Sequence, residues 1–359
     1  MLYSHGCIQV PEKVLRELFF TECMVVKHMR VAVLCLFLLS VPFPLLPSQN
    51  PHSPIFNGSN AYEHLTAQTD FGPRPPGSDN LSLCRQYIVD TLETYNWTVT
   101  LQNFTYKDVD CVNIIGTWAS EESSQYVFGA HYDTRPFADN DPDVNNRNEP
   151  VLGANDGASG VGVLLELAIA LPIDIRSSVE LVFFDAEDSG NIDGWDWIVG
   201  STYYVDQLTP TRIDSINGMI LVDMVGDANL RLPREGSSTQ SLQDAVWDIA
   251  TDLSHGDIFL EESGGSIIDD HRPFLLAGIP ALDLIHTPFP WYWHTVEDTP
   301  DKCSAESLEV VGEVLEVFIV NQSTDFSTFT ENGTFDVFLV ALLVSPIVIV
   351  GIFILYRRK

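Results

Sequence analysis

Strand-like and helix-like segments alternate between about residue 51 and residue 325 of this 359-residue chain. Runs rich in Val, Ile, Leu and Phe predict strands, and stretches with apolar residues at helical spacing predict helices. We expect strands at 125–131, 178–184, 218–222 and 279–285, and helices at 157–171, 201–208, 238–253 and 304–320. This alternation predicts a single α/β domain with a mostly parallel, twisted central sheet flanked by helices.

Two further apolar runs lie near the ends of the chain. Residues 31–46 carry no charge and follow Lys27 and Arg30, a pattern typical of a signal peptide or signal anchor. Residues 337–356 are also uncharged and long enough to span a bilayer, and three basic residues follow them directly. The alternative for residues 337–356 is a helix buried in the protein core, and Pro346 supports this alternative. The positive-inside rule places both basic flanks in the cytoplasm.

The chain is therefore expected to be membrane-anchored, with its folded domain outside the cytoplasm. Its predicted parts are a targeting region at 1–50, a domain at 51–323, a polar stalk at 324–336, a transmembrane helix at 337–356 and a basic cytoplasmic tail at 357–359. N-glycosylation sequons are consistent with export. They begin at Asn57, Asn80, Asn96, Asn103, Asn321 and Asn332.

Charge and cysteine content exclude some classes of protein. A net charge of −32 with only 18 Lys and Arg argues against nucleic acid as a partner and fits a strongly solvated surface. Cys84, Cys111 and Cys303 fall within the domain without CxxC spacing. One disulfide is possible, but an odd number of cysteines does not make a disulfide framework.

Five short segments at or just after the predicted strands carry His, Asp and Glu. They are GAHYD with His131 and Asp133, GANDGAS with Asp156, FFDAED with Glu187 and Asp188, LVDMVGD with Asp223, and YWHT with His294. Ligands of open α/β sheets bind beyond the carboxyl ends of the strands. Histidine and carboxylate side chains are also the ligands of zinc sites in hydrolases. The combination predicts a metal site in that crevice.

Each segment taken singly has a plainer interpretation. A strand-ending His131 is more often an ordinary buried or surface histidine, and Asp133 beside it could fix its tautomer. Asp156 stands where an Asp commonly caps a helix N-terminus. The acidic run from Asp139 to Asn145 lacks the Gly and closing Glu of a calcium loop, so a surface loop is favoured there. Burial of Glu187 after an apolar strand would raise its pKa, which suits a proton shuttle.

With these residues in view, the chain resembles the zinc-dependent aminopeptidase and glutaminyl cyclase superfamily. The resemblance covers most of the domain, from Phe71 to about Val320. It is carried by GAHYDTRPFADNDPD, LGANDGASGV, FFDAEDSG, SIIDDHRPFLLAGIPALDLI and WHTVEDT. It implies a zinc exopeptidase-like fold and a substrate that is a peptide or protein with a free N-terminus.

Two kinds of enzyme share this scaffold. In an aminopeptidase, two zinc ions would be held by His131, Asp156 and Asp223 and by Asp156, Asp188 and His294, with Glu187 activating a water molecule. In a glutaminyl cyclase, one zinc would be held by Asp156, Asp188 and His294. Glu187 would then take a proton from the α-amine of an N-terminal Gln, which attacks its own side-chain amide.

Three features favour the cyclase. Asp269 stands where these aminopeptidases usually carry Ser, and the resemblance implies that it shares a proton with Asp223. Trp293 before His294 matches the cyclases. Trp195, Phe289, Trp291 and Trp293 could form an aromatic pocket for the glutamine side chain.

Other residues keep the alternative open. The segment 155–159 is closer to the peptidases, and Asp188 stands where animal cyclases have Glu, although bacterial cyclases also use Asp. A non-catalytic ectodomain is the least favoured interpretation, because every metal ligand is present. The sequence thus predicts a glutaminyl-peptide cyclotransferase with one zinc, and a two-zinc aminopeptidase as the alternative.

Overall fold

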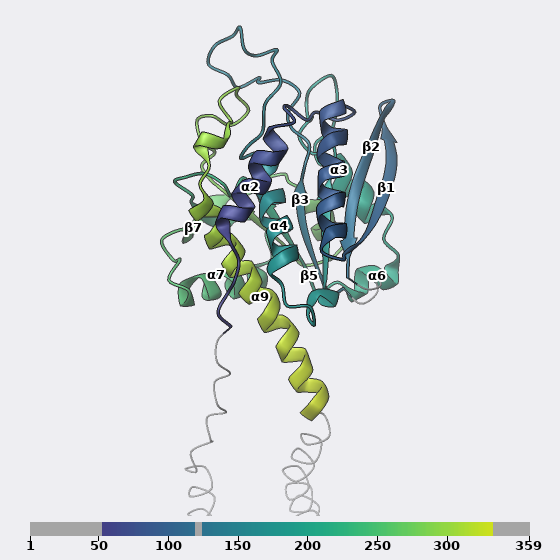
Figure 1. Ribbon diagram of the computed structural model, residues 1–359, viewed down its shortest axis with the longest axis vertical. Helices are drawn as coiled ribbons and strands as arrows, with labels where there is room; N and C mark the ends of the chain where they lie inside the picture. The colour runs from purple at the N-terminus through teal and green to yellow at the C-terminus, as the bar shows by residue number, and fades with distance from the viewer. Residues whose placement is uncertain (1–51, 119–123, 333–359) are drawn as a thin grey trace, which may run out of the picture. The chain divides into compact units, whose positions relative to one another are not determined.

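The computed structural model describes residues 52–118 and 124–332 (Figure 1). The predicted targeting region at 1–50 and the predicted membrane span at 337–356 lie outside these residues. Within the described part, no helix combines the length and apolar character that crossing a membrane requires. Helix α9 (Ala305–Asn332) is continuous through residues 324–332, which belong to the predicted stalk.

A six-stranded mixed sheet forms the centre of the described domain. Its order is β1 (Thr98–Tyr106), β2 (Val109–Thr117), β4 (Val179–Phe184), β3 (Tyr126–His131), β5 (Gly218–Asp223) and β8 (Ala281–Ile285). Strands β4, β3, β5 and β8 are parallel, as predicted, whereas β1 and β2 pair antiparallel with each other and β2 with β4. The sheet is therefore mixed. Strands β6 (Leu232–Glu235) and β7 (Phe259–Gly265) form a small separate sheet.

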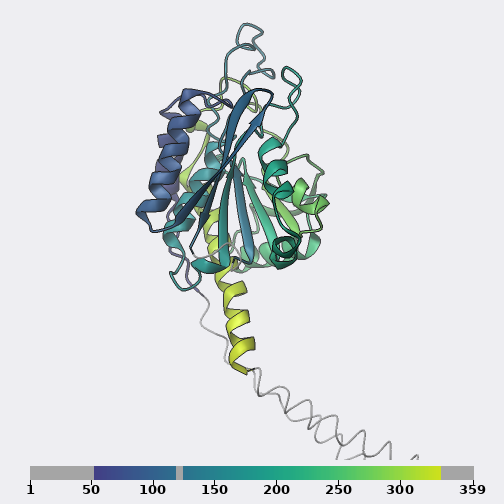
Figure 2. The same ribbon diagram turned by 90° about the vertical axis from the view of Figure 1, so that its right-hand side faces the viewer.

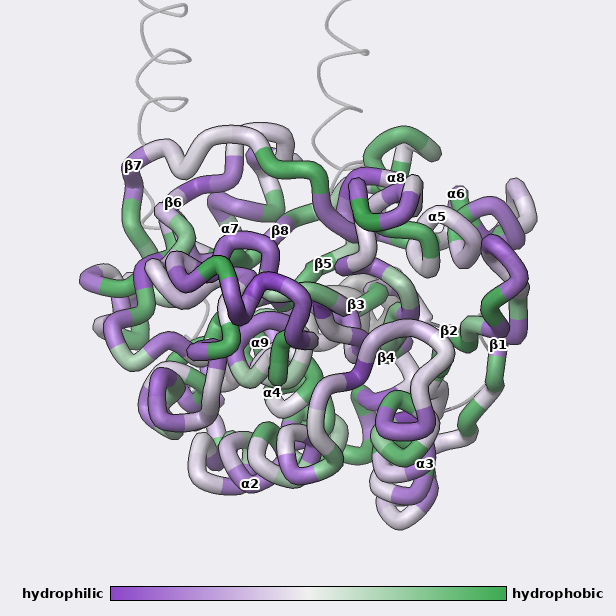
Figure 3. The backbone as a smooth tube through the Cα atoms, turned by 90° about the horizontal axis from the view of Figure 1, so that it is seen from above, coloured by the Kyte–Doolittle hydropathy of each residue, from purple (hydrophilic) through white to green (hydrophobic). Residues whose placement is uncertain are grey.

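Helices cover both faces of the central sheet (Figures 2 and 3). One face carries α2 (Gly58–Thr69), α3 (Asp79–Thr94), α4 (Ala158–Ala170), α7 (Gln240–Asp252) and α9. The other carries α5 (Val199–Asp206), α6 (Pro210–Ser215) and α8 (Arg272–Leu276). Two short 3₁₀ helices, Arg176–Ser178 and Pro300–Lys302, precede β4 and α9.

Alternate residues of the parallel strands enter two different cores. Leu181 and Phe183 of β4 pack on the α4 side, whereas Val182 and Phe184 pack on the α5 side. Burial on both faces makes such strands continuous apolar runs, which is why the sequence pattern located them. The predicted helices correspond in the same way to α4, α5, α7 and α9.

Helix α4 approaches strand β5 closely at Gly160. A Cβ atom on Gly160 would lie 2.0 Å from the Val222 carbonyl oxygen, which is backbone and has little freedom to move. Only glycine allows this contact, and it fixes the start of α4 beside Asp223, the residue after Val222.

We predict that Gly160→Ala destabilises the fold by about 1–3 kcal/mol, because the added methyl group must push α4 away from β5. Urea unfolding measures the change. Gly256→Ala is the matched control, since its Cβ would meet only the Thr251 hydroxyl at 3.8 Å. Equal stability changes for the two variants would contradict the packing argument.

Candidate metal centre

The predicted ligands come together at the carboxyl ends of the parallel strands. His131 is the last residue of β3 and Asp223 the last of β5, while Asp188 follows β4 and Asp156 precedes α4. From β3 the chain proceeds to β4 on one side and then to β5 on the other. Such a switch in strand order opens a crevice at the strand ends, which is where this cluster lies.

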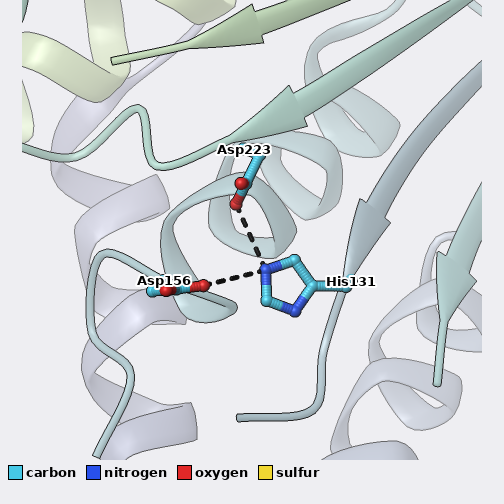
Figure 4. A group of neighbouring side chains, drawn as sticks. All are labelled: His131, Asp156 and Asp223. Atoms are coloured by element: carbon cyan, nitrogen blue, oxygen red, sulfur yellow. Dashed lines mark hydrogen bonds and ion pairs between the residues drawn. The ribbon is translucent and has the colours of Figure 1, made fainter. Parts of the chain in front are cut away.

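Two groups of three ligands share Asp156. In the first, His131 Nε2 lies 3.2 Å from Asp156 Oδ1 and 3.2 Å from Asp223 Oδ1 (Figure 4). In the second, His294 Nε2 lies 3.5 Å from Asp156 Oδ2 and 3.1 Å from Asp188 Oδ1. Each oxygen of Asp156 thus faces a different histidine.

These groups fit zinc. Ligands at the usual zinc distances of about 2.0–2.1 Å in a tetrahedron are about 3.3 Å apart, which matches the ligand separations above. Asp188 Oδ2 is buried and has no hydrogen-bond partner. A buried carboxylate oxygen in that situation is expected to bind a cation. Asp156, Asp188 and His294 therefore form a fitting site, and His131 with Asp223 extends it to a second position.

The local electrostatics favour positive charge. Burial opposes the charged form of His294, but Asp188 and Asp156 outweigh it and raise its pKa to about 9. Burial likewise opposes a charged His131, whose pKa is nevertheless raised well above its ordinary value by Asp133, Asp156 and Asp223. The same negative potential attracts a divalent cation.

Two fully buried aspartates hold the backbone of the ligand segments. Asp133 accepts hydrogen bonds from the amides of Glu187 and Asp188, at 3.0 and 3.2 Å. Asp298 accepts from those of Asn155 and Asp156, at 2.8 and 3.1 Å. Asp133 also contacts the His131 imidazole as expected, with Oδ1 3.5 Å from Nδ1, although this contact is an ion pair and not a hydrogen bond. Asp298 was missed, although WHTVEDT places it four residues after His294.

Asp156 does not cap helix α4. The N-cap is Gly157, with φ 105° and no side-chain capping bond, so the Asp156 carboxylate is free to face the two histidines. A Cβ on Gly157 would also lie 2.4 Å from the Asp133 carbonyl oxygen. Because Gly157 takes the N-cap position, the Asp156 side chain is available as a metal ligand instead of a helix cap.

The acidic run from Asp139 to Asn145 supports His294 instead of forming a separate site. Arg135 binds Asp139 through two hydrogen bonds of 2.7 and 2.8 Å, and Asp139 Oδ1 lies 3.7 Å from His294 Nδ1. Asp141 accepts a bond from the Val296 amide. These contacts hold a turn in which His294 itself has φ 57°.

Glu187 stands beside the ligand groups in a pocket of about 160 Å³. Burial, Asp188 and Asp270 raise its pKa well above the ordinary value, against the opposing charge of His131. Ala186 before it has φ 60°, a strained conformation held by the surrounding hydrogen bonds. A carboxyl group with a raised pKa at a pocket wall is suited to accept and return a proton during a reaction.

The aromatic lining of this pocket differs from the prediction at two positions. Phe289 and Trp293 line it as expected, with ring centroids 4.3 Å apart. Trp195 instead packs against Tyr106, and Trp291 is 68% exposed outside the pocket. Trp197, which was missed, is the third aromatic wall and stacks parallel to His294. The loop from Asn191 to Ile198 has several positive φ angles, which no sequence period reveals.

The sharing of a proton between Asp223 and Asp269 stays a prediction. Asp223 bonds to His131, and Asp269 Oδ1 accepts from the amide of Asp270. Both carboxyl groups nevertheless line the pocket. Burial and the charges of Asp283 and Asp223 raise the pKa of Asp269 well above its ordinary value. The two therefore interact through space, with Asp269 favoured in its neutral form.

Comparison with known proteins agrees with this geometry. Residues 113–319 match the model of Peptidase family M28. A glutaminyl-peptide cyclotransferase-like protein of Bos taurus is 28% identical over 281 residues, which cover 68% of this chain and 71% of that protein.

Two solved structures align with nearly their full length. A glutaminyl cyclase of Porphyromonas gingivalis superposes with a TM-score of 0.71 at 32% identity, covering 75% of this chain and 100% of the other. A leucine aminopeptidase precursor of Bacteroides thetaiotaomicron gives 0.69 at 34% identity, covering 75% and 99%. Both kinds of enzyme expected from the sequence are thus represented.

We predict that Asp298→Asn weakens zinc binding by about 10- to 100-fold. The amide keeps one acceptor for the two backbone N–H groups, so Asp156 loses its fixed position. Competition with a metal-sensitive dye measures the affinity. Asp301→Asn, an exposed change three residues away, is the control and should keep the wild-type affinity. A wild-type zinc affinity in Asp298→Asn would contradict the positioning role.

Proposed function

The chain belongs to peptidase family M28, and from this premise we propose that it is a zinc-dependent glutaminyl cyclase. The reaction converts the N-terminal Gln of a peptide to pyroglutamate and releases ammonia. One observation carries the proposal. Glu187, the ligands Asp156, Asp188 and His294, and the aromatic walls all line the same small pocket. Its volume of about 160 Å³ is well below the roughly 300–1,000 Å³ of pockets for drug-sized ligands, so it suits a single side chain.

A zinc ion held by Asp156, Asp188 and His294 would polarise the carbonyl of the glutamine side-chain amide. The protein positions Asp188 and Asp156 through the hydrogen bonds of Asp133 and Asp298 described above, and His294 through the turn that Asp139 and Asp141 hold. Arg135 also donates to Asp188 Oδ1 at 3.3 Å and limits how that carboxylate can rotate. The ligand positions are thus set by the fold.

Glu187 would move the proton. As the α-amine nitrogen bonds to the amide carbon, Glu187 takes the proton that the amine loses. As the bond between that carbon and the amide nitrogen breaks, Glu187 gives the proton to the leaving group, which departs as ammonia. One carboxyl group therefore ends the reaction in its starting state. The raised pKa of Glu187 suits both steps, because the same carboxyl group must take up a proton and give it back within one turnover.

The aromatic walls would hold the glutamine side chain and limit the access of water. Trp197 and Trp293 both stack against His294, with ring centroids 6.1 and 3.8 Å from it. They form flat surfaces against which a planar amide can lie. An attacking amine within the substrate itself makes a water nucleophile unnecessary.

We propose a single catalytic zinc at Asp156, Asp188 and His294. What supports this count is the position of Asp269, whose carboxyl group faces the pocket near Asp223 and favours the neutral form. A neutral carboxyl group at this place occupies space and adds little negative charge. It therefore makes the possible second metal position, at His131, Asp156 and Asp223, less suited to a cation. Asp223 and Asp269 would then shape the pocket beside the reacting groups.

A two-zinc aminopeptidase is the second candidate. One observation favours it: His131, Asp156 and Asp223 form a complete second group of ligands with the same spacing as the first. Glu187 would then activate water for attack on the peptide bond.

The proposed substrates are peptides or proteins with a free N-terminal Gln, met outside the cytoplasm by an enzyme anchored through residues 337–356. This part of the proposal rests on the sequence pattern of the two apolar runs and their basic flanks.

Extraction of membranes at high pH tests whether the protein is anchored in the membrane. Retention in the membrane fraction is expected, and complete release would contradict the anchor.

We predict that Glu187→Gln lowers ammonia release from Gln-peptides by about 10²- to 10⁴-fold, because the amide cannot accept the proton of the amine. Coupled detection of ammonia gives the rate, and metal analysis checks that zinc stays bound. Glu166→Gln is the control, since Glu166 is a buried carboxyl on α4 away from the pocket. Turnover at the wild-type rate in Glu187→Gln would remove the proposed proton shuttle.

A further inference from the structure

Trp197 also lines a second pocket. It has a volume of about 210 Å³ and opens to solvent. Trp197 lines both this pocket and the catalytic one, so a single side chain forms their common wall. The remaining lining comes from β1 and from the α5 region: Phe104, Thr105, Tyr106, Asp196, Val199, Thr202, Tyr203 and Asp206.

The walls of this second pocket are aromatic. The rings of Phe104 and Tyr203 stack with centroids 4.6 Å apart, and Tyr106 and Trp197 also line the pocket. Faces of aromatic rings attract cations. The Lys107 ammonium already lies 5.9 Å from the centroid of the Tyr106 ring.

Two carboxylates add negative charge to these walls, and no lining residue is basic. Asp196 is held in place by the Tyr106 hydroxyl, which donates a hydrogen bond of 2.6 Å to it. Asp206 is exposed at the last position of helix α5, where the helix dipole is also negative. Aromatic faces combined with carboxylates are complementary to the long side chain and charged end of Lys or Arg.

We propose that this pocket binds a Lys or Arg side chain of the peptide substrate, shortly after its N-terminal Gln. The inference rests on the proposed function, since it takes the Gln to occupy the catalytic pocket. Because Trp197 lines both pockets, we take roughly two or three further residues, at about 3.3–3.6 Å each, to be enough to reach the second one. The enzyme would thus prefer basic Gln-peptides, in keeping with its net charge of −32.

Two matched peptides test the preference. Gln-Ala-Arg-Ala-amide and Gln-Ala-Glu-Ala-amide differ only at the third residue, and a parallel pair carries the same change at the fourth residue. Each kcat/KM is divided by that of Gln-amide, which cannot reach the second pocket. We expect the Arg peptide of at least one pair to exceed its Glu counterpart by about fivefold or more, as one exposed ion pair and a cation–π contact allow.

Charge reversal at Asp206 locates the effect. Asp206→Lys should reverse the preference toward the Glu peptide. Asp252→Lys, at the exposed end of α7, makes the same change in net charge and should leave the preference intact. Equal values for the Arg and Glu peptides in both pairs would overturn the proposal. So would a preference that Asp206→Lys and Asp252→Lys reduce alike, because the effect would then belong to net charge.

The proposed function has a separate readout in the same series. A wild-type enzyme that releases no ammonia from Gln-amide would contradict the cyclase reaction. The second pocket is then tested by calorimetry on zinc-loaded protein with the same peptides. Tighter binding of the Arg peptide that is lost in Asp206→Lys supports the pocket, and equal binding of both peptides rejects it.

Discussion

Buried negative charge at the carboxyl ends of β3, β4 and β5 is the constraint on which the rest of the structure depends. Asp156, Glu187, Asp188 and Asp223 are all buried there, with Asp133 and Asp298 directly behind them. Uncompensated carboxylates at such depth are strongly unfavourable, so they must be protonated, hydrogen-bonded or bound to a cation. All three solutions occur here. Asp269 has a raised pKa that favours its neutral form, Asp133 and Asp298 accept backbone hydrogen bonds, and Asp156, Asp188 and Asp223 face the two histidines in groups that fit zinc. The raised pKa of Glu187 lets it exchange a proton during the proposed reaction.

The surrounding fold fixes the positions of these buried carboxylates around the pocket. Backbone amides fix the segments that carry Asp156 and Asp188, and the close contact of Gly160 with Val222 fixes α4 beside Asp223. Positions set in this way do not need to reorganise during a reaction, which is the main source of electrostatic catalysis. The same segments end in aromatic walls, so metal ligands, proton carrier and substrate pocket are parts of one rigid arrangement. Trp197 lines both this arrangement and the second pocket, for which we propose a Lys or Arg side chain of the substrate.

The sequence located the ligands because their positions follow from simple periodicity. Strands buried on both faces read as apolar runs, and the parallel connection of β3, β4, β5 and β8 brings their ends together. Strands β1 and β2 were not expected, and β1 is largely exposed and polar. Trp195 was chosen in place of Trp197 because side-chain directions in a loop with positive φ angles do not follow a repeat. The pairing of Asp223 with Asp269 stays a prediction, because the direction of a buried carboxylate depends on donors from distant segments such as His131 and does not follow from a sequence repeat.

The central claim is that an amine of the substrate, and not water, attacks the carbonyl beside Glu187. Mass spectrometry of a Gln-peptide turned over by the zinc-loaded enzyme, in water labelled with heavy oxygen, tests it directly. Ring closure predicts a peptide of unchanged length that has lost one ammonia and gained no heavy oxygen. A peptide shortened by its first residue, with heavy oxygen in the released Gln, would contradict the cyclase and identify a water-driven aminopeptidase.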